Sequence, residues 1–263
     1  ALVTIEKATG TDHTLVATGL NNLGDLYYTK GDYDSAEPLL KRALAIFEKL
    51  LGPDHPDVAY CLNNLGLIYK TRSDYDSAEP LFKRALAINE KAKGPDHPDV
   101  AACLNNLGFL YKERGDYASA EALYKRALAI MEKAKGPDHP DVATCLNNLG
   151  NLYKNRGDYD SAEALYKRAL AIYEKAKGPD DTFVAYSYCL DDLGRLYQTR
   201  SDYASAEPLL KRALTMFEKF LGPDHPDVAE CLENLARLYK ATKRIPEANA
   251  LEKRAARIRA IKR

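Results

Sequence analysis

The sequence predicts an all-α solenoid, built from antiparallel helix pairs that stack on one another along the chain. The first observation behind this prediction is an internal repeat. The segment GPDHPDVA begins at residues 52, 94, 136 and 222, and the related segments GTDHTLVA and GPDDTFVA begin at residues 10 and 178. The spacing is 42 residues four times and then 44 residues. A regular period of about 20–50 residues is typical of stacked repeats and not of a domain with a single core.

The second observation is that each period contains two segments with helical spacing of apolar residues. In the third repeat, Leu104, Gly108 and Tyr111 fall on one face of a helix. After Gly115, a second set of apolar residues follows the same period over residues 117–135. A single helix pair of this size leaves an apolar face uncovered, and stacking on the neighbouring pair buries that face.

The third observation is that glycine, proline and histidine mark the ends of the helices. Gly136 suits the left-handed conformation just past a helix end, and Pro137 does not continue a helix. Pro140 suits the first position of the next helix, where Asp141 is favourable beside the positive end of the helix dipole. We expect the histidine of each turn to cap a helix and pack in the turn, because neighbouring copies are too far apart to share a metal ion. These histidines are His13, His55, His97, His139 and His225.

These signals organise the chain as one repeat array. The predicted segments are a truncated second helix of a preceding repeat with its linker at 1–16, repeats at 17–58, 59–100, 101–142, 143–184 and 185–228, and a C-terminal capping repeat at 229–263. The fifth repeat carries two additional residues before its cysteine. We expect its first helix to start differently or to bulge, with Phe183, Tyr186 and Tyr188 as a candidate epitope.

Composition and charge exclude several classes of function. The 38 basic and 38 acidic residues give a formal net charge of zero, which argues against a nucleic-acid footprint and against a polybasic membrane patch. Charged residues interrupt every apolar run before the length of about 18 residues that a membrane span needs, and the N-terminus has no signal pattern. No catalytic triad, phosphate loop or pair of buried acids can be placed. We therefore predict a cytoplasmic protein that is not an enzyme and has no cofactor or metal.

The cysteines all occupy one repeated position, directly before the first leucine of the first helix. Equivalent positions on packed helices lie about 8–10 Å apart, which exceeds the Cα separation of about 7 Å that a disulfide tolerates. No CxxC segment occurs, so a zinc site is not expected. We predict that the cysteines are small, reduced core residues; they are Cys61, Cys103, Cys145, Cys189 and Cys231.

The repeated residues resemble a known family pattern. In the third repeat they are Leu107, Gly108, Tyr111, Ala120, Tyr124 and Ala127, and in the second they are Leu65, Gly66, Tyr69, Ala78, Phe82 and Ala85. This set resembles the signature of tetratricopeptide repeats. The 42-residue variant with its LNNLG segment is similar to the repeats of kinesin light chains, and the resemblance covers essentially the whole chain. It implies a right-handed superhelix whose first helices line a concave groove, and a role as a partner-binding scaffold.

The arc of the first helices that the resemblance assigns to the groove is rich in asparagine. An asparagine side chain both donates and accepts hydrogen bonds, so a row of them can satisfy the backbone of an extended peptide. The resemblance implies that the second member of each pair does so, which gives Asn22, Asn64, Asn106, Asn148 and Asn234; their neighbours include Asn63, Asn105 and Asn147. Selectivity is expected where the copies differ, in a column that includes Leu67, Phe109, Asn151, Arg195 and Arg237.

The predicted function is that of a scaffold that binds a protein or peptide segment in this groove. An alternative is that the asparagines hydrogen-bond adjacent repeats to one another and bind no ligand. The chain is then an architectural or self-associating module, whose ends stack between molecules. A third alternative is one part of a regulatory protein that senses nucleic acid or associates with an enzyme.

Overall fold

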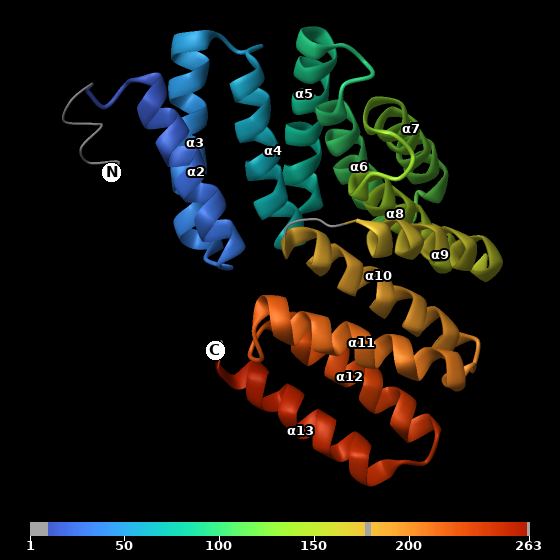
Figure 1. The fold of residues 1–263 in the computed structure, drawn as a ribbon. Coiled ribbons are helices and arrows are strands. Elements are labelled where there is room, and N and C mark those ends of the chain that lie inside the picture. Colours follow the sequence, from blue (N-terminus) through green and yellow to red (C-terminus); the bar gives the residue numbers. More distant parts are fainter. Residues whose placement is uncertain (1–9, 177–179, 262–263) are drawn as a thin grey trace. The chain divides into compact units, whose positions relative to one another are not determined.

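The computed structural model describes residues 10–176 and 180–261 (Figure 1). Within these residues the regular structure consists of twelve α-helices and no strand, which confirms the predicted all-α solenoid. The first helices of the hairpins are α2 (Thr14–Thr29), α4 (Pro56–Thr71), α6 (Pro98–Glu113), α8 (Pro140–Arg156), α10 (Asp180–Thr199) and α12 (Pro226–Ala241). The second helices are α3 (Tyr33–Leu51), α5 (Tyr75–Lys93), α7 (Tyr117–Lys135), α9 (Tyr159–Lys175), α11 (Tyr203–Leu221) and α13 (Ile245–Ile261).

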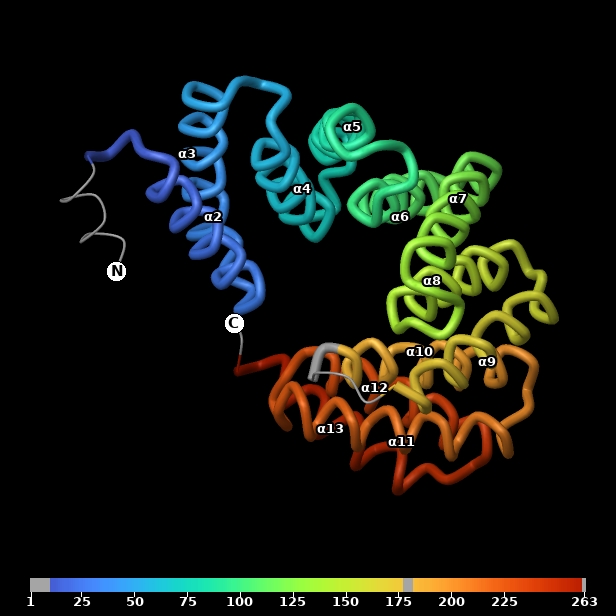
Figure 2. Tube along the Cα trace, turned by 45° about the horizontal axis from the view of Figure 1, so that its top comes forward, coloured from blue at the N-terminus to red at the C-terminus, as the bar shows by residue number. Residues whose placement is uncertain are grey.

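The chain divides into two compact units between residues 134 and 135. The first unit contains the hairpins α2–α3, α4–α5 and α6–α7, and the second contains α8–α9, α10–α11 and α12–α13 (Figure 2). Inside the first unit, α2 contacts α4 and α4 contacts α6; inside the second, α8 contacts α10 and α10 contacts α12. The first helices of consecutive hairpins are therefore neighbours within each unit, and their polar side chains can reach one another.

The turn histidines cap the helices that follow them, as predicted. The Nδ1 atom of each accepts a hydrogen bond from the backbone N–H two residues later, at 3.1–3.3 Å. These bonds satisfy one of the donors that a helix start leaves without a partner. The second helices use aspartate for the same purpose, and Asp74 accepts from the backbone N–H of Ser77 at 3.1 Å. The cysteines are also as predicted: all five are free and buried.

The two helices of a hairpin approach closely where a glycine faces a large side chain. A Cβ atom at Gly66 would lie 2.6 Å from Cε1 of Phe82, whose side chain is fully buried. The hairpin α6–α7 has the same arrangement between Gly108 and Tyr124. In the last hairpin the glycine is replaced by Ala236, and the position aligned with Phe82 is Glu252. This place therefore holds no large apolar side chain of the kind that faces the glycines of the other repeats, and the additional methyl group fits.

Within the two units, α4, α6, α10 and α12 are each tied back to the preceding second helix through a glutamate. Tyr69 donates its hydroxyl to Glu37 at 2.9 Å, and Arg72 pairs with the same carboxylate. Equivalent tyrosine and arginine side chains contact Glu79, Glu163 and Glu207. The hydrogen bond from Lys41, supported by Tyr69 and Arg72 and opposed by burial, lowers the pKa of Glu37 to about 2. The pKa values of Glu79 and Glu207 are also lowered to about 2.

These lowered pKa values predict a loss of stability in acid. A carboxylate with a lowered pKa in the folded state stabilises the fold above its unfolded pKa, and this contribution disappears as pH falls through the folded value. We therefore expect the free energy of unfolding, measured by urea denaturation, to fall steadily from pH 5 to pH 2. The variant Glu79→Gln should flatten part of this slope. Equal stability at pH 5 and pH 3 would contradict the prediction.

The two additional residues of the fifth repeat are accommodated at the start of α10. This helix begins nine residues before Cys189, whereas α8 begins five residues before Cys145. It starts earlier and continues without a bulge through its described residues. In the other repeats, the valine and alanine three and two residues before the cysteine are buried. Tyr186 and Ser187 have the same sequence separation from Cys189, and they are buried in the same places. The Phe183 ring stacks on Phe220, with ring centroids 4.7 Å apart.

Some expectations fall outside the described residues. Residues 1–9 of the truncated helix expected at 1–16 are not among the described residues, and neither are residues 177–179 before α10. In the described parts of the chain, no helix is both long and apolar enough to span a bilayer. In the same residues, histidine, cysteine, aspartate and glutamate side chains form no group of three that could hold a metal ion.

Candidate binding surface

The asparagine pairs of the first unit are joined to one another between consecutive first helices. Asn64 on α4 donates its amide to Oδ1 of Asn21 on α2, at 3.4 Å, and Asn106 on α6 donates to Oδ1 of Asn63 at 2.9 Å. In both cases the second asparagine of one repeat reaches the first asparagine of the repeat before it. The thiol of Cys61 also donates to Asn21, at 3.1 Å. Hydrogen bonds of the kind described by the architectural alternative are therefore present.

The second unit has a charged form of the same connection. Asn234 on α12 donates to both carboxylate oxygens of Asp191 on α10, at 2.9 Å each. Asn234 is fully buried and Asp191 is 7% exposed. Burial raises the pKa of Asp191 to about 6, and the hydrogen bond from Asn234 opposes this rise. A buried carboxylate of this kind depends on its amide partner for compensation.

The neighbouring Asp192 gathers three donors from α8. Asn147 and Asn151 donate amide hydrogens to its Oδ2 atom at 3.1 and 2.7 Å, and Lys154 donates to Oδ1 at 3.2 Å. Asn151 also accepts a hydrogen bond from the hydroxyl of Tyr166, at 2.9 Å. The lysine of this repeat therefore has a carboxylate partner inside the chain.

The predicted site residues differ widely in exposure. Asn22 and Arg237 are exposed, and Asn64 and Asn234 are buried. The remaining predicted residues are half-buried: Asn63, Asn105, Asn106, Asn147, Asn148, Leu67, Phe109, Asn151 and Arg195. Arg195 lies 3.9 Å from Asp191 and 3.6 Å from Glu230, and Arg237 donates to Asn234. The amide hydrogens of Asn64 and Asn234 that donate to the neighbouring helix would reach a partner only if these hydrogen bonds broke.

A cationic and aromatic surface lies between α4 and α6, and we call Lys70, Asn106, Phe109 and Lys112 the Lys–Phe–Lys surface. The amine of Lys70 lies 5.1 Å from the centroid of the Phe109 ring, and that of Lys112 lies 4.8 Å from it. Lys112 pairs with Glu113 at 2.9 Å. Lys70 instead donates to the neutral Oδ1 atom of Asn106, at 3.2 Å.

The position of Lys70 changes its protonation. Burial, and to a smaller degree the positive charge of Lys112, lowers the pKa of Lys70 to about 8. Lys154, at the same position two repeats later, has the carboxylate of Asp192 where Lys70 has an amide. Lys70 therefore occupies a place where this fold accommodates a carboxylate.

Sequence reasoning identified Asn106 and Phe109 but not Lys70 as site residues. A lysine follows the tyrosine of the first helix at Lys70, Lys112, Lys154 and Lys240, and this recurrence is a signal that could have found it. The acceptors of Lys70 and Lys154, however, differ because the next repeat carries Asn106 in one case and Asp192 in the other. That difference becomes informative only when the helices are placed side by side.

Hairpins that pack through a glycine and a large side chain, and that meet along a polar face, define the chain as a helical-repeat protein of the scaffold class. The sequence profile of the tetratricopeptide repeat family matches residues 1–49, 15–91, 72–133, 106–175 and 181–260. The chain therefore belongs to the tetratricopeptide repeat family. A search among curated protein sequences returned no match.

Several solved structures share the fold. BtubC (BKLC) from P. vanneervenii is 26% identical with a TM-score of 0.65, over 84% of this chain and 87% of that one. A putative kinesin light chain from Podosopora anserina with nearly identical TPR-like repeats is 24% identical with a TM-score of 0.60, over 79% and 98% of the two chains. The apo form of RapI is 17% identical with a TM-score of 0.72, over 98% and 87%. The predicted likeness to kinesin-light-chain repeats is thus confirmed for the fold.

Proposed function

We propose that the chain is a non-catalytic scaffold that binds a protein or peptide segment along its first helices, and that an acidic side chain of this segment contacts the Lys–Phe–Lys surface. The observation that carries the proposal is the environment of Lys70. Lys70 is half-buried, its amine lies against Phe109 and beside a second lysine, and among the described residues this amine donates to the neutral amide of Asn106. A carboxylate from a partner would supply the charge that Asp192 supplies to Lys154.

Two further features support this proposal. Stacked helical repeats present extended surfaces that commonly bind other proteins. The half-buried Phe109 offers apolar area beside the charges, and its ring meets Tyr75 edge to face at 6.3 Å. A segment with an acidic residue next to an apolar one fits this combination. Five free, buried thiols are typical of a reducing compartment, so we also propose a cytoplasmic location.

A peptide library displayed against the wild-type chain tests the proposal. We expect selected peptides to be enriched in Asp or Glu and to lose at least about tenfold in affinity for the variant Lys70→Met/Lys112→Met, equivalent to about 1.4 kcal/mol. Isothermal titration calorimetry measures the loss. Lys91→Met is the matched control, because Lys91 is exposed and pairs with Asp54 on the loop before α4. Equal affinity of wild type and double variant would reject the proposal.

The same titration has an expected pH dependence. Lys70 loses its charge as pH rises through about 8, so affinity for an acidic peptide should fall between pH 7 and pH 9. A bound carboxylate favours the charged amine and moves the midpoint above that of the free chain. The variant Lys70→Met should lack this dependence.

A second candidate function is an architectural or self-associating module. It is favoured by the hydrogen bonds that engage Asn64 and Asn234 between helices. This function predicts that no peptide is enriched and that the mass measured by sedimentation grows with protein concentration. A monomeric mass at all concentrations would contradict self-association.

A further inference from the structure

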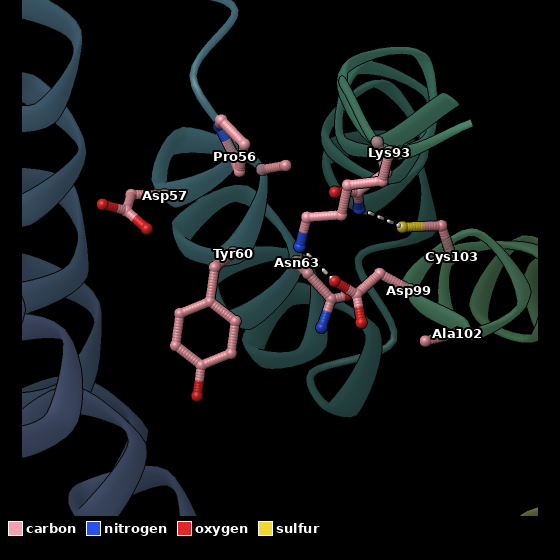
Figure 3. A pocket seen from close by; sticks show the side chains of 10 residues that line it. Pro56, Asp57, Tyr60, Asn63, Lys93, Asp99, Ala102 and Cys103 are labelled. Carbon is pink, nitrogen blue, oxygen red and sulfur yellow. Dashed lines mark hydrogen bonds and ion pairs between the residues drawn. The ribbon is translucent and has the colours of Figure 1, made fainter. Parts of the chain in front are cut away.

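The first unit contains a pocket of about 270 Å³ between α4, α5 and α6 (Figure 3). We call it the Asn89 pocket. Pro56, Asp57, Ala59, Tyr60 and Asn63 of α4 line it, together with Asn89 of α5 and Ala102 and Cys103 of α6. Lys93 and Asp99, which form an ion pair, also line it.

The pocket exists because one residue departs from a repeated apolar position. The second helices carry Phe47, Met131, Tyr173 and Phe217 at the position that Asn89 occupies in α5. The counterpart in the second unit is lined by Tyr188, Asp191, Phe217 and Cys231, in the same relative places as Tyr60, Asn63, Asn89 and Cys103. Its volume is about 60 Å³.

A ring of the chain itself fills most of the counterpart. Phe217 is 2% exposed and meets the ring of Tyr188 edge to face, with centroids 5.0 Å apart at 69°. In the Asn89 pocket the tyrosine is present as Tyr60, but the opposing ring is missing. A cavity of about 150 Å³ is enough to bind benzene, so the Asn89 pocket has room for one aromatic ring with a substituent.

The polar groups of the Asn89 pocket define the substituent. Asn89 is 6% exposed and donates its amide to Sγ of Cys103 at 3.6 Å, so its carbonyl oxygen can accept a hydrogen bond. Burial raises the pKa of Cys103 to about 11, so the thiol beside Asn89 carries no charge at neutral pH. The charged lining residues are Asp57 and the paired Lys93 and Asp99. The methyl groups of Ala59 and Ala102 contribute apolar surface. An uncharged ring that carries one hydroxyl group matches these walls.

We propose that the Asn89 pocket binds one hydroxylated aromatic ring, of the kind found in a tyrosine side chain or a free phenol. The ring packs against Tyr60 in the place that Phe217 takes beside Tyr188. The hydroxyl donates to Oδ1 of Asn89. This proposal does not depend on the acidic-peptide function, because the pocket and the Lys–Phe–Lys surface use different side chains.

The test is a titration of the full chain with p-cresol, followed by NMR chemical shifts and calorimetry. We expect one p-cresol per chain with saturable shifts at Tyr60 and Asn89, and affinity at least tenfold lower for toluene, which lacks the hydroxyl. Asn89→Phe should abolish binding, because it adds the ring that Phe217 provides in the second unit. Phe217→Asn should create a second site. A parallel titration with N-acetyl-tyrosine amide separates two sources of the ring. If the natural ligand is a tyrosine side chain of a peptide, this compound must bind; if it is a free phenol, p-cresol binds and this compound does not.

Folding of the variants is checked by circular dichroism. Asn89→Phe should stay folded, because three repeats carry an aromatic residue at this position; Asn89→Met, which copies Met131, is a second variant that fills the pocket. If Phe217→Asn unfolds, wild type and the two filled variants still decide the question. Absence of p-cresol binding to the wild type, or equal binding to wild type, Asn89→Phe and Asn89→Met, overturns the proposal.

Discussion

Replacing Gly66 with alanine is expected to lower the free energy of unfolding by about 3 kcal/mol, at the upper end of the range for overpacked cores. The new methyl group would lie 2.6 Å from the ring of Phe82. That ring is fully buried between helices, so it cannot move aside without displacing α4 or α5. Urea denaturation followed by circular dichroism measures the loss.

Two variants separate this steric effect from a general sensitivity of the helix. Ala236→Gly, at the equivalent place in the last repeat, should cost only the difference in helix propensity, about 1 kcal/mol, because Glu252 stands where the ring would be. The double variant Gly66→Ala/Phe82→Ala should be more stable than the sum of the single changes predicts, since the clash is gone. A change of less than about 0.5 kcal/mol for Gly66→Ala would show that α4 and α5 do not pack in this way.

Asn234→Ala is expected to cost about 3 kcal/mol at pH 7.5, the magnitude typical of a buried charge that loses its partner. The change removes both amide hydrogen bonds to Asp191. Without them the pKa of Asp191 should rise above its present value of about 6. A carboxyl group with a raised pKa stabilises the fold at low pH, and this contribution is lost as pH rises through the folded value. The variant should therefore be less impaired at pH 5 than at pH 7.5.

The matched control is Asp191→Asn, which copies the amide pair of Asn63 and Asn106. It removes the buried charge and keeps a partner for Asn234, so we expect a stability at pH 7.5 equal to or above that of the wild type. Its stability should also vary less between pH 4 and pH 7. If Asp191→Asn proved as harmful as Asn234→Ala, the carboxylate itself would have to be essential to the interface.

Much of the fold could be predicted because the repeat shows every structural signal several times. The period of 42 residues, the glycine and proline at helix ends and the apolar spacing all indicate the same helical pairs. The capping role of the histidines and the burial of the cysteines also followed from their repeated places. The start of α10 was less predictable, because a two-residue insertion could lengthen the helix or distort it. Burial relative to Cys189 shows that it lengthened the helix.

The binding surface was harder to predict than the fold. An asparagine on the first helix suits a peptide and a neighbouring asparagine equally well, and only the placement of Asn64 beside Asn21 shows which bond is made in the free chain. The environment of Lys70 depends on residues in two helices. Asn89 is a single polar residue in an apolar column, and its consequence, a cavity, becomes visible only by comparison with Phe217. Whether the predicted asparagines contact a partner stays a prediction.

The most direct measurement is the pKa of Lys70, obtained by NMR titration of its side chain in the free chain and with a saturating acidic peptide from the library. In the free chain we expect a value of about 8. In the complex we expect a value clearly higher, because a carboxylate of the peptide then lies beside the amine. A pKa of Lys70 that the peptide leaves unchanged would contradict the proposal that this surface receives the acidic side chain of a partner.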